Sequence, residues 1–171
     1  MGVNIYMRIK GWCECMYTVC KVKIWNIVKL LQVSNILYKC GKDMAEKYNL
    51  HHWNNSHIKN WVIVALCVTK NQIYLVYDKK VPVATFQTRK IGQSFLFQKL
   101  ATSPRVMGMG IGSFCLKEIE CLAMQQNCKE ILCEVYDRSE HAKRFYEHKG
   151  YSVYGEMATL KYKELKFKKE L

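Results

Sequence analysis

The stretch MGMGIGS, residues 107–113, follows LATSP, residues 100–104, and carries the sharpest signal in the sequence. It lies between a predicted strand at residues 95–102 and an amphipathic helix predicted over residues 110–127. Glycine has no Cβ atom, so the backbone can turn tightly and bring successive N–H groups close to a bulky anion. These N–H groups are also the first, unpaired donors of the helix, and the helix dipole adds positive potential. The stretch therefore predicts a turn that binds a diphosphate.

Other classes of protein use similar glycines, in ordinary tight turns and in Rossmann folds. A P-loop is excluded because no Gly-Lys-Ser/Thr follows. A nicotinamide-binding Rossmann unit has an acid after the next strand, about where Glu134 lies, but it places its glycine loop after the first strand. Here the loop begins near residue 104 of 171.

Working outward from this stretch, hydrophobic periodicity predicts strands and helices along the rest of the chain. We expect a short edge strand at residues 7–9, a strand at 17–24, a helix from 24 to Gly41 and a second short helix at 42–48. Ser56 is a candidate cap for a helix that runs to residue 68, although a buried strand fits this run too. A hairpin follows, with arms at residues 73–77 and 82–88.

Towards the C-terminus we expect a buried strand at residues 131–135 and a helix that ends at Gly150. Asp137 and Glu140 resemble a capping box at its start. Strands at 152–157 and 159–167 finish the chain, and the strongly basic last strand is expected at a solvated edge. The order predicts an α/β or α+β fold, a mixed sheet covered by helices.

The bulk composition indicates one globular domain over residues 1–171, with half of the residues hydrophobic and only two prolines. The longest apolar run, residues 61–68, is less than half of what a membrane-spanning helix needs. We therefore expect no membrane partner and a cytoplasmic location. Nine scattered cysteines favour reduced thiols over disulfides. Cys13 and Cys15 lack a second ligand pair, so no metal site is expected.

The charge is strongly positive, with 27 Lys and Arg against 14 Asp and Glu. Such a charge favours an anionic partner, which can be a nucleotide cofactor, a nucleic acid or an acidic protein. A solvated basic surface explains it equally well. The lysine-rich segment 161–169 suggests nucleic acid, but no known nucleic-acid-binding motif accompanies it, so that partner is not expected.

Two blocks in this order resemble the GNAT superfamily of acetyl-CoA-dependent N-acetyltransferases. Residues 107–112 fit its cofactor motif of Arg or Gln, two residues, Gly, one residue, and Gly or Ala. The second block comprises residues 134–137, Ser139, Ala142 and residues 145–151, and it is similar to the family's Asn-x-x-Ala and Phe-Tyr-Glu-x-x-Gly-Phe pattern. The resemblance covers residues 73–157.

The resemblance implies a twisted, mostly antiparallel sheet of six to seven strands with about four helices. Its fourth and fifth strands splay apart, and the pantetheine arm of acetyl-CoA lies in the gap. The implied cofactor-binding residues are Leu100, Ala101, Thr102, Arg105, Met107, Gly108, Met109, Gly110, Ile111, Gly112, Ser113, Ser139, Ala142 and Tyr146. The chain departs from the motif at two of these positions. Met107 replaces the usual Arg or Gln, for which Arg105 or the backbone alone would have to substitute, and Ser139 replaces the helix-opening Asn.

The resemblance also implies direct attack of an amine on the thioester, without an acyl-enzyme. Tyr146 matches the family's general acid, although a buried tyrosine can also be purely structural. Glu134 can act as a base through water, or serve structure alone. Cys133 is a less favoured nucleophile because a buried thiol without a base is inert. His51, His52, Trp53 and Trp61 fall where the family builds its acceptor pocket, or are only loop and core.

The sequence thus predicts an N-acetyltransferase acting on a primary amine of a small molecule or protein, with a homodimer as a plausible assembly. The alternative is a regulatory module that binds acyl-CoA without catalysis.

Overall fold

The computed structural model describes residues 17–53, 61–158 and 162–171. The expected strand at residues 7–9, the Cys13 and Cys15 pair and the Ser56 cap lie outside these residues. No helix among the described residues has both the length and the apolar character that a membrane span requires.

One seven-stranded sheet organises the described chain, in the order β1-β2-β3-β4-β5-β7-β6. Every neighbouring pair is antiparallel except β4 and β5, which run parallel. The strands are β1 (Tyr17–Val22), β2 (Gln72–Asp78), β3 (Val81–Ile91), β4 (Ser94–Thr102), β5 (Glu130–Tyr136), β6 (Ser152–Ala158) and β7 (Lys163–Glu170). This mostly antiparallel mixed sheet confirms the predicted fold class.

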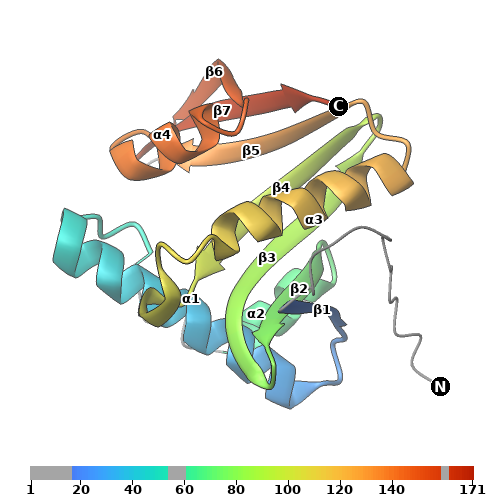
Figure 1. The fold of residues 1–171 in the computed structure, drawn as a ribbon, viewed down its shortest axis with the longest axis vertical. Helices are drawn as coiled ribbons and strands as arrows, with labels where there is room; N and C mark the ends of the chain where they lie inside the picture. Colours follow the sequence, from blue (N-terminus) through green and yellow to red (C-terminus); the bar gives the residue numbers. More distant parts are fainter. Residues whose placement is uncertain (1–16, 54–60, 159–161) are drawn as a thin grey trace.

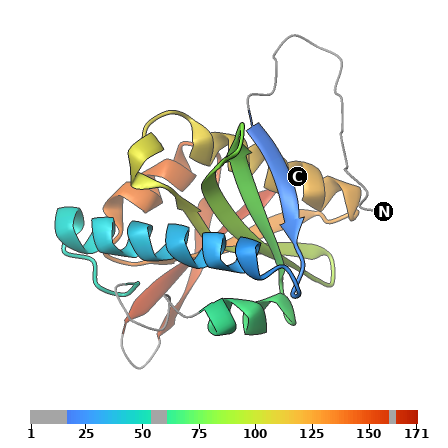
Figure 2. The ribbon, with the colours of Figure 1, turned by 90° about the horizontal axis from the view of Figure 1, so that it is seen from below.

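Helices cover both faces of the sheet (Figures 1 and 2). They are α1 (Ile27–Tyr48), α2 (Trp61–Val68), α3 (Ile111–Gln125) and α4 (Glu140–Glu147), and a short 3₁₀ turn, η2 (Pro104–Val106), leads into α3. On the α3 and α4 face, buried Phe86, Phe95 and Phe97 pack with Ile119. On the α1 and α2 face, Leu30 and Val33 pack with Ile73 and Leu75. Burial of two apolar faces fixes the sheet between two helix layers.

The first half of the chain departs from prediction, because residues 27–48 form one helix of 22 residues instead of two. Glycine usually weakens a helix, and for that reason Gly41 was expected to end the first one. In the structure Gly41 is buried inside α1, and a Cβ atom there would lie 2.7 Å from the carbonyl oxygen of Trp53. The glycine allows close packing of the following loop and does not terminate the helix.

The basic last strand was also expected at an edge, and this expectation is wrong. β7 lies inside the sheet between β5 and β6, and β6 is the edge strand. Lysine is compatible with an interior strand because backbone pairing leaves the side chains free to form ion pairs. Lys163 pairs with Glu156, and Lys169 lies 2.8 Å from Glu120.

The helix after β5 begins differently from the capping box that the sequence suggested. Its N-cap is Ser139, and α4 begins at Glu140. Glu140 forms an ion pair with Lys143 (Nζ to Oε1 2.5 Å), while the Asp137 N–H donates to the carbonyl of Lys163. Ser139, and not Asp137, is therefore the N-cap of α4.

Candidate active site

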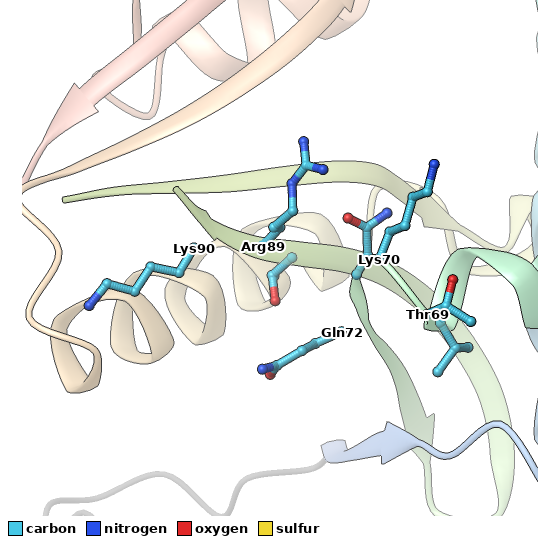
Figure 3. A pocket seen from close by; sticks show the side chains of 8 residues that line it. Thr69, Lys70, Gln72, Arg89 and Lys90 are labelled. Carbon is cyan, nitrogen blue, oxygen red and sulfur yellow. The ribbon is translucent and has the colours of Figure 1, made fainter. Parts of the chain in front are cut away.

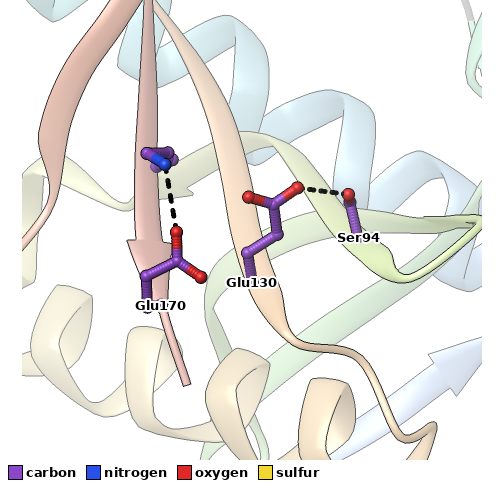
Figure 4. A network of polar contacts seen from close by, with 4 residues as sticks. Ser94, Glu130 and Glu170 are labelled. Carbon is purple, nitrogen blue, oxygen red and sulfur yellow. Dashed lines mark hydrogen bonds and ion pairs between the residues drawn. The ribbon is translucent and has the colours of Figure 1, made fainter.

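β4 and β5 separate after a short paired stretch, as the splayed strands of the prediction required. They pair only from Ser94 to Leu96, opposite Glu130 to Leu132, although both strands continue. The Ser94 hydroxyl donates to Glu130 at 2.5 Å at the paired end (Figure 4). Figure 1 shows β5 diverging from β4 beyond this point. The last link across the opening is the Gln98 side-chain amide, which donates to Glu134 at 2.9 Å.

A bulge in β4 accompanies the separation. Lys99 has a left-handed φ of 50°, and the register against β3 shifts at this position. A bulge bends its strand and increases the local twist, so it turns the end of β4 away from β5. Beyond the bulge, Ala101 and Thr102 still pair with β3 on one side. Their other side faces the opening, where no described residue of β5 pairs with them.

The predicted glycine turn stands at the end of this β4 segment. Gly108 and Gly110 have φ values of 81° and 79°, and a Cβ atom on either would meet nothing within 4 Å. Gly110 is the N-cap of α3, and its carbonyl accepts the first intrahelical bond, from the Phe114 N–H at 3.0 Å. The N–H groups of Ile111, Gly112 and Ser113, which precede Phe114 in the first turn of α3, thus lie at the open helix end, as a diphosphate site requires.

Gly112 serves packing more than the turn. It lies in the first turn of α3, and an added Cβ atom would stand 3.3 Å from Cζ of Phe145 on α4. The glycine therefore lets α4 approach α3. Of the residues expected to bind the cofactor, Ile111 is buried in the core and Ser113 is half-buried.

The two side chains considered for the diphosphate are both at the surface. Arg105 in η2 is exposed and forms no ion pair with any described residue. Met107 is 43 % exposed, and Met109 is exposed as well. Arg105 is therefore a cation in the segment leading into the turn that is available to an anion.

Tyr146 lies on the α4 side of the opening, inside an aromatic cluster. Its ring centroid is 5.7 Å from that of Phe97 on β4 and 6.2 Å from that of Phe167 on β7. Burial raises the pKa of its phenol well above the usual value, with further contributions from Cys133 and Tyr151. The hydroxyl therefore stays protonated at neutral pH and can donate a proton or a hydrogen bond.

Glu134 lies on the opposite side of the sheet from Tyr146. Along β5, Cys133 and Val135 are buried in the α3 and α4 core, whereas Glu134 and Tyr136 are half-buried on the α1 face. Glu134 accepts a hydrogen bond from the Gln98 side-chain amide. No described residue forms an ion pair with it. Its carboxylate can accept a proton at the α1 side of the opening.

The other residues considered around the second block, Ser139, Ala142 and Cys133, pack in or against the protein interior. Ser139 is buried, its side chain does not cap α4, and its carbonyl accepts the N–H groups of Ala142 and Lys143 at 3.0 Å each. Ala142 packs against the core. Burial raises the pKa of the Cys133 thiol, which makes it a poor nucleophile.

Comparisons with known proteins agree with this geometry. A family profile described as an acetyltransferase (GNAT) domain matches residues 69–153, which contain the separated strands, the glycine turn and Tyr146. Residues 69–153 are an acetyltransferase domain of the GNAT family. The family implies acyl transfer from acetyl-CoA, and the protein is therefore an acyltransferase.

Solved GNAT structures share the fold at low sequence identity. An acetyltransferase from Streptococcus agalactiae has a TM-score of 0.72 at 13 % identity, over 92 % of this chain and 99 % of its own. The PaiA N-acetyltransferase from Thermoplasma acidophilum, solved with coenzyme A, scores 0.68 at 14 % identity, over 91 % and 99 %. The ribosomal-protein-S18-alanine N-acetyltransferase from Escherichia coli scores 0.67 at 12 % identity, over 90 % and 93 %. No curated protein sequence matches the chain.

Aromatic side chains gather on the α1 side of the GNAT domain, where β5 ends. The His52 ring lies 4.3 Å from that of Tyr136 and 6.1 Å from that of Tyr162, and Tyr136 and Tyr162 are 5.5 Å apart. We call these three residues the mouth cluster. Burial, with a smaller contribution from His141, lowers the pKa of His52 to about 4, so its ring is neutral at neutral pH.

Sequence reasoning found only part of this surface. It placed His52 and Trp53 near the acceptor, and the two rings lie 6.0 Å apart. His51 instead turns to Asn49, at 2.8 Å, and the side chain of Trp61 lies outside the described part. Tyr162, Glu164 and Gln98 were missed. Every second residue of β5 points away from the α3 and α4 core, and this alternation could have identified Tyr136. Glu164 lies on β7, and the sequence does not show that β7 pairs with β5.

A pocket of about 190 Å³ lies at the other end of β3, lined by residues of the α2–β2 connection and by Thr88, Arg89 and Lys90 (Figure 3). Ala84 pairs with Thr102 at the end of β4 and is four residues from Thr88 and six from Lys90 along β3, roughly 13–20 Å at the usual strand rise. The labelled Lys70, Arg89 and Lys90 side chains point in different directions. This pocket is separate from the site between β4 and β5.

Within the described ranges the cysteines are all free, and His, Cys, Asp and Glu form no group of three or more that would suit a metal ion. The Cys13 and Cys15 pair is not part of these ranges.

Proposed function

We propose that this protein is an N-acetyltransferase that transfers the acetyl group of acetyl-CoA to a primary amine by direct attack in a ternary complex. The observation that carries the proposal is the opening between β4 and β5, which has a glycine turn at its end, the Tyr146 phenol on one side and the Glu134 carboxylate on the other. Two structural relatives, PaiA and the S18-alanine enzyme, are named as N-acetyltransferases.

The donor would bind along the free side of β4. The backbone groups of Leu100, Ala101 and Thr102 would hydrogen-bond to the pantetheine arm, as a further strand would. The open N–H groups at the start of α3 would bind the diphosphate, and Arg105 would add a positive charge beside it. These residues fit the donor because the turn leaves open space at Gly108 and Gly110.

The acceptor would approach from the α1 side. Glu134 would take a proton from the ammonium group through water, since only a neutral amine attacks the thioester. The new N–C bond forms as the C–S bond breaks, and Tyr146 donates a proton to the departing thiolate from the α4 side. The amide nitrogen then loses its extra proton to solvent, and the Tyr146 phenolate takes a proton back from solvent. The two groups lie on opposite sides of the sheet, so each can reach its own side of the thioester.

Calorimetric titration with acetyl-CoA tests the donor site, with CoA and NADH as comparators. We expect micromolar affinity for acetyl-CoA and none for NADH. Gly110→Val should weaken acetyl-CoA binding at least about tenfold, because a branched side chain at a positive φ fills the space that the diphosphate needs. Gly92→Val is the matched control, since Gly92 also has a positive φ (59°) and open surroundings but lies in the β3–β4 turn.

Thiol release in the presence of a panel of primary amines then tests catalysis. Turnover that depends on both substrates supports the enzyme. Tight acetyl-CoA binding with no turnover on any amine would instead favour a regulatory acyl-CoA module. Equal effects of the Gly110 and Gly92 substitutions on affinity would mean that the diphosphate binds elsewhere.

A further inference from the structure

Glu164 on β7 lies next to the mouth cluster and adds a carboxylate beside its rings. In the β5–β7 register it lies directly opposite Tyr136, and Glu134 is two residues further along β5. Side chains at opposite and diagonal positions of one sheet face are within reach of each other. Burial, with smaller contributions from the charges of Glu164 and Glu134, raises the pKa of the Tyr162 phenol. Rings and two carboxylates therefore share one surface beside the opening.

These two carboxylates have no lysine partner among the described residues, as is also true of Glu118, Glu130 and Glu147. Glu134 and Glu164 differ from those three in lying beside Tyr136 of the mouth cluster, on one face of the β5–β7 pair. Glu46, Glu120, Glu140, Glu156 and Glu170 each form an ion pair with a lysine. Glu134 and Glu164 form none with any described residue, although the sequence carries a net charge of +13. Lys166, the cross-strand partner of Glu134, is not within ion-pair distance of either.

The surroundings make a cation at this surface favourable. Glu164 is half-buried, and burial together with the charge of Glu134 raises the pKa of its carboxyl. A bound cation would lower the pKa of the Glu164 carboxyl again, because an opposite charge stabilises a carboxylate. The neutral rings of the mouth cluster add π faces, which attract ammonium groups and offer nothing comparable to an anion.

Resting on the amine transfer proposed above, we propose that the acceptor carries a second cationic group beside its reacting amine, bound by His52, Tyr136, Tyr162 and Glu164. The reacting amine would lie at Glu134, and the second ammonium would lie among the rings, next to Glu164. The acceptor class is thus an aliphatic diamine or a larger molecule that presents two neighbouring ammonium groups.

Kinetics with three small amines, at saturating acetyl-CoA, test this site. The probes are 1,4-diaminobutane, 1-aminobutane and 4-aminobutanoate, which differ mainly in the charge at the far end. We expect kcat/KM to be at least about tenfold higher for the diamine than for the monoamine, and lowest for the anionic probe. Glu164→Gln should reduce the preference for the diamine towards one, and Tyr162→Leu should reduce it in part.

Glu170→Gln is the matched control. Glu170 lies on the same strand, at its far end, and pairs with Lys168 at 3.0 Å (Figure 4). This substitution should preserve the preference for the diamine. Thermal unfolding and acetyl-CoA affinity, measured for every variant, separate a lost site from a lost fold.

The outcomes distinguish this inference from the function on which it rests. Equal kcat/KM for the diamine and the monoamine, or a preference for the diamine that survives Glu164→Gln, would overturn the dicationic acceptor and leave amine transfer intact. If no amine is acetylated although acetyl-CoA binds, amine transfer itself fails and the inference fails with it.

Discussion

At the scale of single residues, the hydroxyl of Tyr146 is the atom on which the proposed chemistry depends most. Tyr146→Phe removes this hydroxyl and keeps the ring that packs against Phe97 and Phe167. We expect kcat to fall by about 10²-fold, the usual contribution of a general acid, while the Kd of acetyl-CoA changes less than about twofold. Steady-state kinetics and calorimetric titration measure the two effects.

Tyr151→Phe is the control, because the ring of Tyr151 lies 5.8 Å from that of Tyr146 in the same cluster. The Tyr151 hydroxyl is buried without a hydrogen-bond partner among the described residues, so its removal should leave kcat unchanged. An unchanged kcat in Tyr146→Phe would show that Tyr146 is a core residue. A comparable fall in both variants would trace the effect to packing.

Sequence reasoning identified residues that act through their own backbone or local motif. Gly108 and Gly110 were predictable because a turn before a helix needs positive φ, and both have it. Gly112 stays a predicted cofactor-binding residue, but its packing against Phe145, more than thirty positions away in sequence, was not predictable. Glu164 was missed for the same reason, since the role proposed for it depends on its position opposite Tyr136 of β5. Contacts between distant segments decide such roles, and local patterns do not contain them.

At the scale of elements, strands and helices with clear periodicity were found close to their true positions, β4 and α3 among them. The errors concern features that depend on contacts with distant parts of the chain. Gly41 was expected to end a helix because its propensity is low, but packing on α1 outweighs propensity. β7 was assigned to an edge from its lysines, although strand order depends on pairing partners that composition does not specify.

The position of Gly41 in α1 leads to a prediction whose sign opposes helix propensity. Alanine in place of glycine in a helix is normally stabilising, by roughly 0.5–1 kcal/mol. Here its Cβ atom would lie 2.7 Å from a backbone oxygen of Trp53, which cannot move without shifting the loop. We expect Gly41→Ala to destabilise the protein by about 1–3 kcal/mol, as overpacked cores do, measured by urea unfolding.

Asn35→Ala provides the comparison on the same helix. Asn35 is exposed in the middle of α1, where alanine gains propensity without meeting a neighbour. This variant should be slightly more stable than the parent protein. A stabilised Gly41→Ala variant would mean that the loop at Trp53 yields easily and does not fix the mouth cluster next to α1.

At the scale of the whole molecule, the positive charge is unevenly distributed along the chain. Between Asp78 and Glu118 the sequence contains no acidic residue, and this segment includes β3, β4 and the glycine turn. Most of the acids follow it, and those of β5 and β7 include Glu134 and Glu164. The β4 segment and the glycine turn, which are proposed to bind the anionic donor, thus belong to a stretch of sequence without acids. The surface proposed for a cationic acceptor carries Glu134 and Glu164, which form no ion pair with any described residue.

This distribution predicts that salt weakens donor binding. Acetyl-CoA is attracted over long range by a net charge of +13, and raising NaCl from about 0.02 M to about 0.5 M shortens the screening length several-fold. We expect the Kd of acetyl-CoA to rise on the order of tenfold over this range, measured by calorimetric titration. Acetyl-3′-dephospho-CoA, which lacks one phosphate, should show a weaker dependence, because fewer charges interact with the basic segment. A Kd that is independent of salt for both ligands would mean that the lysines and arginines only solvate the surface, and that the open N–H groups at the start of α3 bind the donor without help from the rest of the molecule.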